Sequence, residues 1–132
     1  MMKQNLKVVN DLKCIWEGHS TCGEGPLWVP ENQSLYWVDI DGCQAHRYQY
    51  NDESFQSWNF PEKTGWLLPR EGRSDFIAGC KSGIYEIDLE TGNRKLILDP
   101  EPELPENRFN DAKVDVEGRI WTGSMDDLEK KP

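Results

Sequence analysis

The stretch "SLYWVDIDGCQAHRYQY", Ser34–Tyr50, decides the fold of this chain. Its first part, Ser34–Ile40, is β-branched and aromatic, and its last part, Gln44–Tyr50, alternates in character from residue to residue. Such runs favour strands, and the Asp41–Gly42 pair between them is a favoured hairpin turn. No segment shows a helical period over about 11 residues, so the sequence predicts an all-β protein.

Working outward, the same arrangement recurs along the chain. The segments "LYWVDI", "DFIAGC" and "RIWTGS" begin at residues 35, 75 and 119, so they are separated by 40 and 44 residues. Each follows a polar turn that is preceded by a short apolar stretch. A repeat of about 40–45 residues with four short strands has the size of a propeller blade. A small β-sandwich is the alternative, because its strands also recur every 8–12 residues or so.

The length of the chain bears on this interpretation. Propellers close with about four to eight blades, whereas 132 residues hold about two blades and the start of a third. We therefore expect residues 1–132 to be the N-terminal portion of a single, truncated β-propeller domain, with no separate second domain. A blade that ends after its opening strands leaves an unpaired sheet edge.

Charge and composition exclude several classes of function. The formal net charge of −9 repels phosphate backbones and anionic membranes but suits cations, so we expect no nucleic-acid or membrane partner. The sequence shows no run of about 18 apolar residues and no apolar signal-peptide core near its start. The cysteines have no zinc-finger spacing and indicate reduced thiols in a cytoplasmic protein; they are Cys14, Cys22, Cys43 and Cys80.

Two segments are placed to supply loops at one end of the blades. In "TCGEGPLW", glycines flank Glu24 and Pro26 fixes the exit, so a rigid bend presents one carboxylate. In "RFND", Arg108 and Asn110 would share one face of an extended strand while Phe109 points into the blade. Ordinary surface turns are the alternative reading of both segments.

Glu24 and Asn110 together supply hard oxygen ligands, which suit calcium, magnesium or manganese. Two ligands do not complete a metal site. The segment "DIDG" from Asp39 is not an EF-hand loop, because Tyr50 stands at the twelfth position. Other polar groups are expected to be structural: His19 and His46 as surface or packing residues, and the run "DDLEKK" as a solvated charged segment.

The segments "CGEGPLW", "SLYWVDI" and "NRFNDAKVDVEGRIWTGSM" resemble the opening signatures of the senescence-marker-protein, gluconolactonase and regucalcin family, in the same order. The resemblance runs from Glu17 to about Met125. It implies a six-bladed propeller that holds one divalent cation in its central channel and hydrolyses sugar lactones. The cation would be calcium, zinc, magnesium or manganese. The resemblance also implies that Glu24 is a metal ligand, Asn110 a metal ligand or substrate contact, and Arg108 a substrate contact.

The resemblance leaves other roles open. The family's further metal-binding amide and its general-base aspartate would lie beyond Pro132, so no catalytic base is assigned here. Some members carry a substrate-contacting Glu after a "GTM"-like motif, but the acids that follow "GSM" give no clean match; they are Asp126, Asp127 and Glu129.

The sequence therefore predicts a metal-dependent, gluconolactonase-like hydrolase of sugar lactones, complete only in a full-length parent. A non-catalytic calcium-binding or interaction propeller is the alternative, and a truncated product without function is a third. Arg108 beside Asn110 favours the enzyme, because a bare metal buffer needs no substrate-binding cation. The expected partner is a small sugar lactone, and the sequence assigns no oligomeric state.

Overall fold

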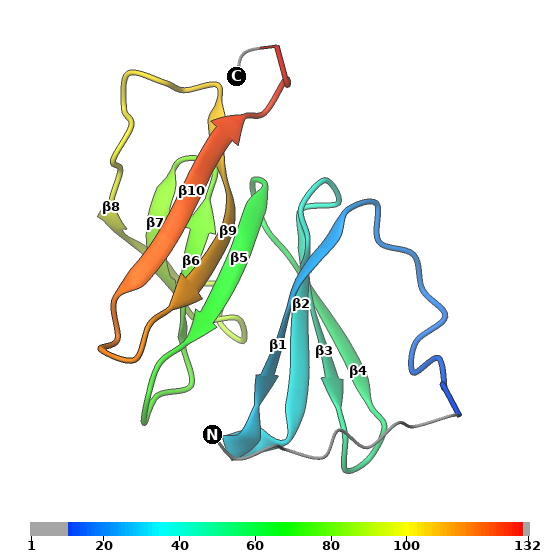
Figure 1. Cartoon of the computed structure of the whole chain (residues 1–132). Coiled ribbons are helices and arrows are strands. Elements are labelled where there is room, and N and C mark those ends of the chain that lie inside the picture. Colours follow the sequence, from blue (N-terminus) through cyan, green and yellow to red (C-terminus); the bar gives the residue numbers. More distant parts are fainter. Residues whose placement is uncertain (1–10, 131–132) are drawn as a thin grey trace, which may run out of the picture.

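The computed structural model describes residues 11–130, which form three antiparallel sheets and no α-helix (Figure 1). The first sheet has the order β1 (Gly23–Val29), β2 (Ser34–Asp39), β3 (Gln44–Gln49), β4 (Phe55–Asn59), with a 3₁₀ turn, η1 (Pro30–Asn32), after β1. The second has the order β5 (Thr64–Pro69), β6 (Phe76–Cys80), β7 (Gly83–Ile87), β8 (Arg94–Leu98). The third pairs β9 (Asn107–Val114) with β10 (Ile120–Asp126). Within these residues no helix has the length and apolar character needed to cross a membrane.

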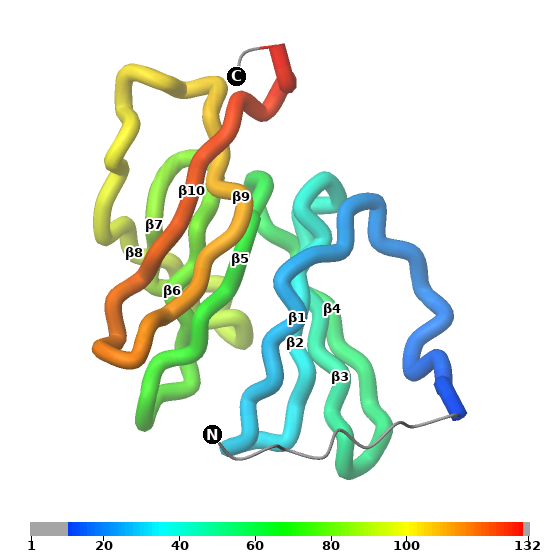
Figure 2. The backbone as a smooth tube through the Cα atoms, in the orientation of Figure 1, coloured from blue at the N-terminus to red at the C-terminus, as the bar shows by residue number. Residues whose placement is uncertain are grey.

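The three sheets are blades of a propeller. In each sheet every strand lies beside its neighbour in sequence, and the first strands β1, β5 and β9 lie next to one another, with β5 contacting both of the others (Figures 1 and 2). The three repeated segments become the second strands β2, β6 and β10. The prediction of an all-β partial propeller, with two blades and the start of a third, is therefore confirmed, and the sandwich alternative is wrong.

The hairpin predicted at Ser34–Tyr50 forms, in the register Ser34↔Gln49 to Asp39↔Gln44. Its loop is longer than a two-residue Asp-Gly turn, because strand pairing resumes only at Gln44. Cys43, the last residue of the loop, has a left-handed φ of 50°.

Alternate residues of the strands pack one blade onto the next. The main core lies between the first and second blades, where the rings of Tyr36 and Phe76 are 5.0 Å apart. A second core joins the second blade to the third through Trp66 and Phe109, whose rings meet edge to face at 5.9 Å. Each fully buried large side chain of this kind contributes about 1.5–3 kcal/mol, so these contacts hold the blades at fixed positions.

Trp66 is the side chain that links the second and third blades. It is 1 % exposed, and its Nε1 donates a hydrogen bond to Thr122 Oγ1 at 2.9 Å. Its indole lies over Gly79, its partner in the register of β5 and β6, where a Cβ would be 2.2 Å from the ring. The strand β6 therefore needs glycine at this position.

We expect Gly79→Ala to lower the free energy of unfolding by at least about 2 kcal/mol, because the added methyl overlaps the indole of Trp66. Thermal or denaturant unfolding followed by tryptophan fluorescence measures this change. Gly123→Ala is the matched control, since a Cβ at Gly123 meets no atom within 4 Å. Equal stability of the two variants would contradict this account of the blade contact.

Candidate functional site

The first strand of each blade is irregular near its beginning. The register shifts between Glu24 and Leu27 in β1, and between Thr64 and Trp66 in β5. In β9, Phe109 and Ala112 pair with Ser124 and Thr122, so two residues of β9 lie opposite one of β10. Such β-bulges change the direction of side chains and occur often beside functional sites.

These irregular segments meet at Gly65. A Cβ on Gly65 would lie 2.4 Å from the carbonyl oxygen of Phe109 and 3.1 Å from that of Asn110. A Cβ on Gly25 would lie 4.0 Å from the carbonyl oxygen of Gly65. The beginnings of β1, β5 and β9 therefore converge at one end of the propeller, at the top of Figures 1 and 2. This convergence brings the segments around Glu24 and Asn110 to the same end of the molecule.

Glu24 lies in β1 immediately before the bulge, and Gly25 adopts a left-handed φ of 61°. This turn agrees with the rigid bend predicted from the flanking glycines. The Glu24 side chain is exposed and makes no hydrogen bond or ion pair with another residue of the described segment. It is a carboxylate left available to a ligand.

Asp39 holds the segment that leads into β1 and Glu24. Its Oδ2 accepts a hydrogen bond from the Thr21 N–H at 2.9 Å, and its Oδ1 accepts from Cys22 at 2.8 Å and Gly42 at 3.0 Å. Burial by itself raises the pKa of Asp39, but these three backbone donors bring it below its ordinary value. The acid of "DIDG" thus anchors the chain on both sides of the site, a role that sequence analysis missed.

The "RFND" segment divides its side chains as predicted. Phe109 is 7 % exposed and packs in the second core, whereas Asn110 is exposed. Arg108 Nη1 donates hydrogen bonds to Asn110 Oδ1 and to the carbonyl of Phe109, both at 3.1 Å. Arg108 and Asn110 therefore form one polar unit; their roles in binding stay predictions.

Asp127 fixes Arg108 from the other side. Its carboxylate, 8 % exposed, accepts from Arg108 Nε at 3.1 Å, Lys63 Nζ at 2.8 Å and Lys81 Nζ at 2.9 Å. Burial raises the pKa of Asp127, but Lys63 and Lys81 lower it to about 2. The expectation that "DDLEKK" is a solvated run is therefore wrong for Asp127, because three cations distant in sequence gather on it.

Charges from both segments of the candidate site act on the pKa of the Cys22 thiol. Burial raises the pKa of Cys22, the carboxylates of Asp41 and Glu24 raise it further, and the guanidinium of Arg108 lowers it. One thiol thus lies within electrostatic reach of both Glu24 and Arg108.

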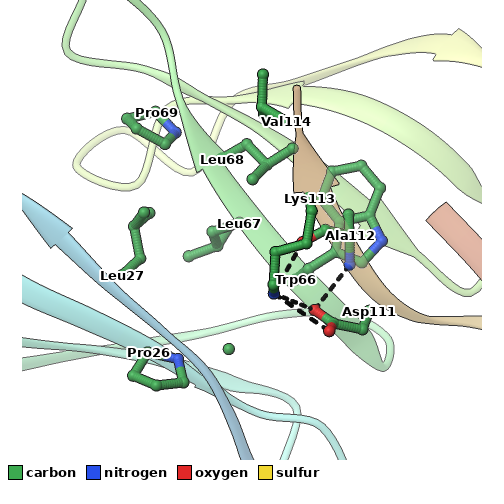
Figure 3. A pocket seen from close by; sticks show the side chains of 11 residues that line it. Pro26, Leu27, Trp66, Leu67, Leu68, Pro69, Asp111, Ala112, Lys113 and Val114 are labelled. Atoms are coloured by element: carbon green, nitrogen blue, oxygen red, sulfur yellow. Dashed lines mark hydrogen bonds and ion pairs between the residues drawn. The ribbon is translucent and has the colours of Figure 1, made fainter. Parts of the chain in front are cut away.

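Below this polar end, the three first strands line a groove of about 450 Å³ (Figure 3). Among residues 11–130, the charged side chains that line it are Asp111 and Lys113, which pair with each other at 3.0 Å. The other lining residues are apolar or glycine; they are Gly25, Pro26, Leu27, Trp66, Leu67, Leu68, Pro69, Ala112 and Val114. The wall of the groove is therefore mainly apolar, and Glu24, Arg108 and Asn110 are not among its lining residues.

The donor set suits a hard cation but is incomplete. Glu24 offers an unpaired carboxylate, and Asn110 Oδ1, which accepts from Arg108, keeps a second lone pair. Carboxylate and amide oxygens are the ligands that calcium, magnesium and manganese prefer. Within residues 11–130 no three His, Cys, Asp or Glu side chains gather where they could hold a metal ion.

His46 is a packing residue, as expected. It is 2 % exposed, its Nδ1 lies 2.8 Å from Ser57 Oγ, and its ring stacks on Phe55.

Fold and site together define a class: a propeller whose first strands present oxygen and guanidinium groups at one end of a central channel. The profile of the SMP-30/Gluconolactonase/LRE-like region family matches residues 22–132, so the chain belongs to that family, as the sequence signatures predicted.

Individual relatives agree with this assignment. The chain is 35 % identical to 6-deoxy-6-sulfogluconolactonase of Pseudomonas putida, over 86 % of this chain and 39 % of the relative. It is 31 % identical to L-arabinolactonase of Azospirillum brasilense, over 98 % of this chain and 43 % of the relative. The crystal structure of regucalcin from Agrobacterium tumefaciens strain C58, described as a calcium-binding protein, superposes with a TM-score of 0.79 at 25 % identity, over 85 % of this chain and 38 % of that one. The chain thus spans about two fifths of the length of these relatives.

We expect Asp127→Asn to reduce the free energy of unfolding at pH 7 by about 1–3 kcal/mol, because three cations lose a charged acceptor. The pKa of Asp127 is about 2 in the folded state against 3.8 ordinarily, so its contribution is complete above about pH 4. The contribution is lost as the pH falls toward 2.

Denaturant unfolding of both proteins between pH 7 and pH 2 measures this difference. Glu71→Gln, an exposed change that removes no hydrogen bond or ion pair among residues 11–130, is the control. A difference between wild type and Asp127→Asn that does not depend on pH would contradict the ion cluster.

Proposed function

We propose that this chain forms part of a metal-dependent hydrolase of sugar lactones. The proposal is carried by one observation: the unpaired carboxylate of Glu24 and the Arg108–Asn110 pair occupy the converging ends of the first strands. Relatives named as lactonases support the choice of reaction. The chain supplies ligands and a substrate-binding cation, and the activity is complete only in a protein that carries further blades.

Glu24 and Asn110 are the residues that would hold the cation, whether calcium, zinc, magnesium or manganese. A bound divalent cation would polarise the lactone carbonyl and stabilise the oxyanion that forms when water attacks. Calcium takes about six to eight oxygen ligands, so the other ligands belong to water, substrate or further blades. The general base likewise belongs to further blades in this proposal.

Arg108 is suited to hold the substrate in place. Its guanidinium is fixed by Asp127 and Asn110, and its side chain is only 10 % exposed. Its Nη2 makes no hydrogen bond to another residue of the described segment, so two of its five N–H groups are available. A guanidinium held in this way would donate to the ring or hydroxyl oxygens of a lactone without first reorganising.

A non-catalytic calcium-binding propeller is the second candidate, and the description of the Agrobacterium regucalcin as calcium-binding favours it. Arg108 argues for catalysis, since calcium binding alone gains nothing from a neighbouring fixed cation, which repels the ion. The two candidates differ in whether bound metal is accompanied by lactone turnover.

The test is lactone hydrolysis with added calcium, zinc, magnesium or manganese, in a protein that joins this chain to the further blades of its family. We expect Glu24→Gln to abolish metal-dependent turnover and to weaken calcium binding measured by calorimetry. Glu31→Gln, which lies beyond the far end of β1, should preserve both. The 132-residue chain alone should give no turnover, and normal activity in Glu24→Gln would exclude Glu24 as a ligand.

A further inference from the structure

One ion cluster at the polar end of the propeller holds more cations than carboxylates. The chain has a formal net charge of −9, yet Lys63, Lys81 and Arg108 all contact the one carboxylate of Asp127. Lys63 also pairs with Asp41 at 2.9 Å. The ion pairs of the cluster therefore join three cations to two carboxylates.

The cluster supports Arg108, and its ion pairs also leave one cation without a carboxylate of its own. Partly exposed ion pairs contribute only about 0–1 kcal/mol, and a second lysine on the same carboxylate brings like charges together. A second pair of basic residues that shares an acid has as many carboxylates as cations. Arg70 and Arg73 contact Asp75, and Arg70 also contacts Glu86. Repulsion within the Asp127 cluster would be relieved by one further anion.

The lysines have hydrogen-bond donors to spare. An ammonium group carries three N–H donors. Among residues 11–130, Lys63 contacts Asp41 and Asp127, and Lys81 contacts Asp127 alone. Both side chains are 30 % exposed, so a ligand can reach them from solvent.

The cluster is continuous with the candidate site. Arg108 bonds to Asp127 through Nε and to Asn110 through Nη1, so one side chain joins the lysines to the proposed metal ligand. The lysines come from the β4–β5 connection and the β6–β7 turn, which lie at the same end as the start of β9 (Figure 1). A substrate held at Asn110 would thus extend toward Lys63 and Lys81.

We propose that Lys63 and Lys81, together with Arg108, bind an anionic substituent of the sugar, namely a carboxylate, sulfonate or phosphate oxyanion. These lysines then act as specificity residues that select acidic sugar lactones over neutral ones. The inference rests on the proposed function and adds the substrate class to it.

Binding is tested without turnover by titrating the 132-residue chain, in the presence of calcium, with sorbitol 6-phosphate and with sorbitol. The two ligands differ only in the anionic group, and neither contains a lactone. We expect sorbitol 6-phosphate to bind at least roughly 10-fold more tightly, with an advantage that shrinks as salt is added.

Lys63→Gln and Lys81→Gln should each reduce the affinity for sorbitol 6-phosphate by roughly 5–10-fold and leave that for sorbitol unchanged. Lys113→Gln is the matched control, because Lys113 pairs with Asp111 in the apolar groove. Since Lys63 and Lys81 both support Asp127, both glutamine variants are checked by thermal unfolding. Lys63→Arg, which keeps the charge, should retain tight binding.

Equal affinity for the two ligands would overturn the inference, as would unchanged affinity in both glutamine variants. Inorganic phosphate that binds as tightly as sorbitol 6-phosphate would also overturn it, because no sugar would then be recognised. Hydrolysis of glucono-1,5-lactone by the protein with further blades is measured in parallel. If the lactone is hydrolysed but sorbitol 6-phosphate binds no more tightly than sorbitol, only the proposed substrate class is rejected. If sorbitol 6-phosphate binds more tightly but the lactone is not hydrolysed, only the proposed reaction is rejected.

Discussion

The close approach of β5 and β9 at Gly65 is the constraint on which the structure depends. The carbonyl oxygens of Phe109 and Asn110 in β9 lie where a side chain on Gly65 would begin. A Cβ on Gly25 of β1 would lie 4.0 Å from the carbonyl oxygen of Gly65. Strands that approach so closely leave no space for side chains between them, so the polar groups of the bulges are directed to the end of the channel. The apolar groove below and the polar end above are consequences of this one convergence.

Two carboxylates, the buried Asp39 and the partly buried Asp127, position the two halves of the candidate site by different means. Asp39 accepts from backbone N–H groups and holds the segment that leads into β1, whereas Asp127 accepts from cations and holds Arg108. Burying an acid is costly unless its charge is compensated, so each of these residues needs its particular partners. The groups that would bind ligands are thereby attached to rigid, internally satisfied supports.

Membership in the SMP-30/Gluconolactonase/LRE-like family fits this division between support and site. The fold is shared with relatives named as lactonases and with one described as a calcium-binding protein. A shared fold does not by itself determine function, which depends on the groups placed at the site. Here those groups are an unpaired acid, an amide and a fixed guanidinium, with two lysines beside them.

The sequence by itself determined the β-hairpins, the repeat of 40 and 44 residues, the family, and the opposite directions of Phe109 and Asn110. Each of these depends on local regularities: the two-residue period of a strand, turn chemistry, and the spacing of short motifs. Only the tertiary structure decided that Lys63, Lys81 and Arg108 surround Asp127, and that Gly65 must lack a side chain. The physical reason is that these contacts join three blades, and the meeting of residues so far apart in the chain depends on how the blades pack around the axis.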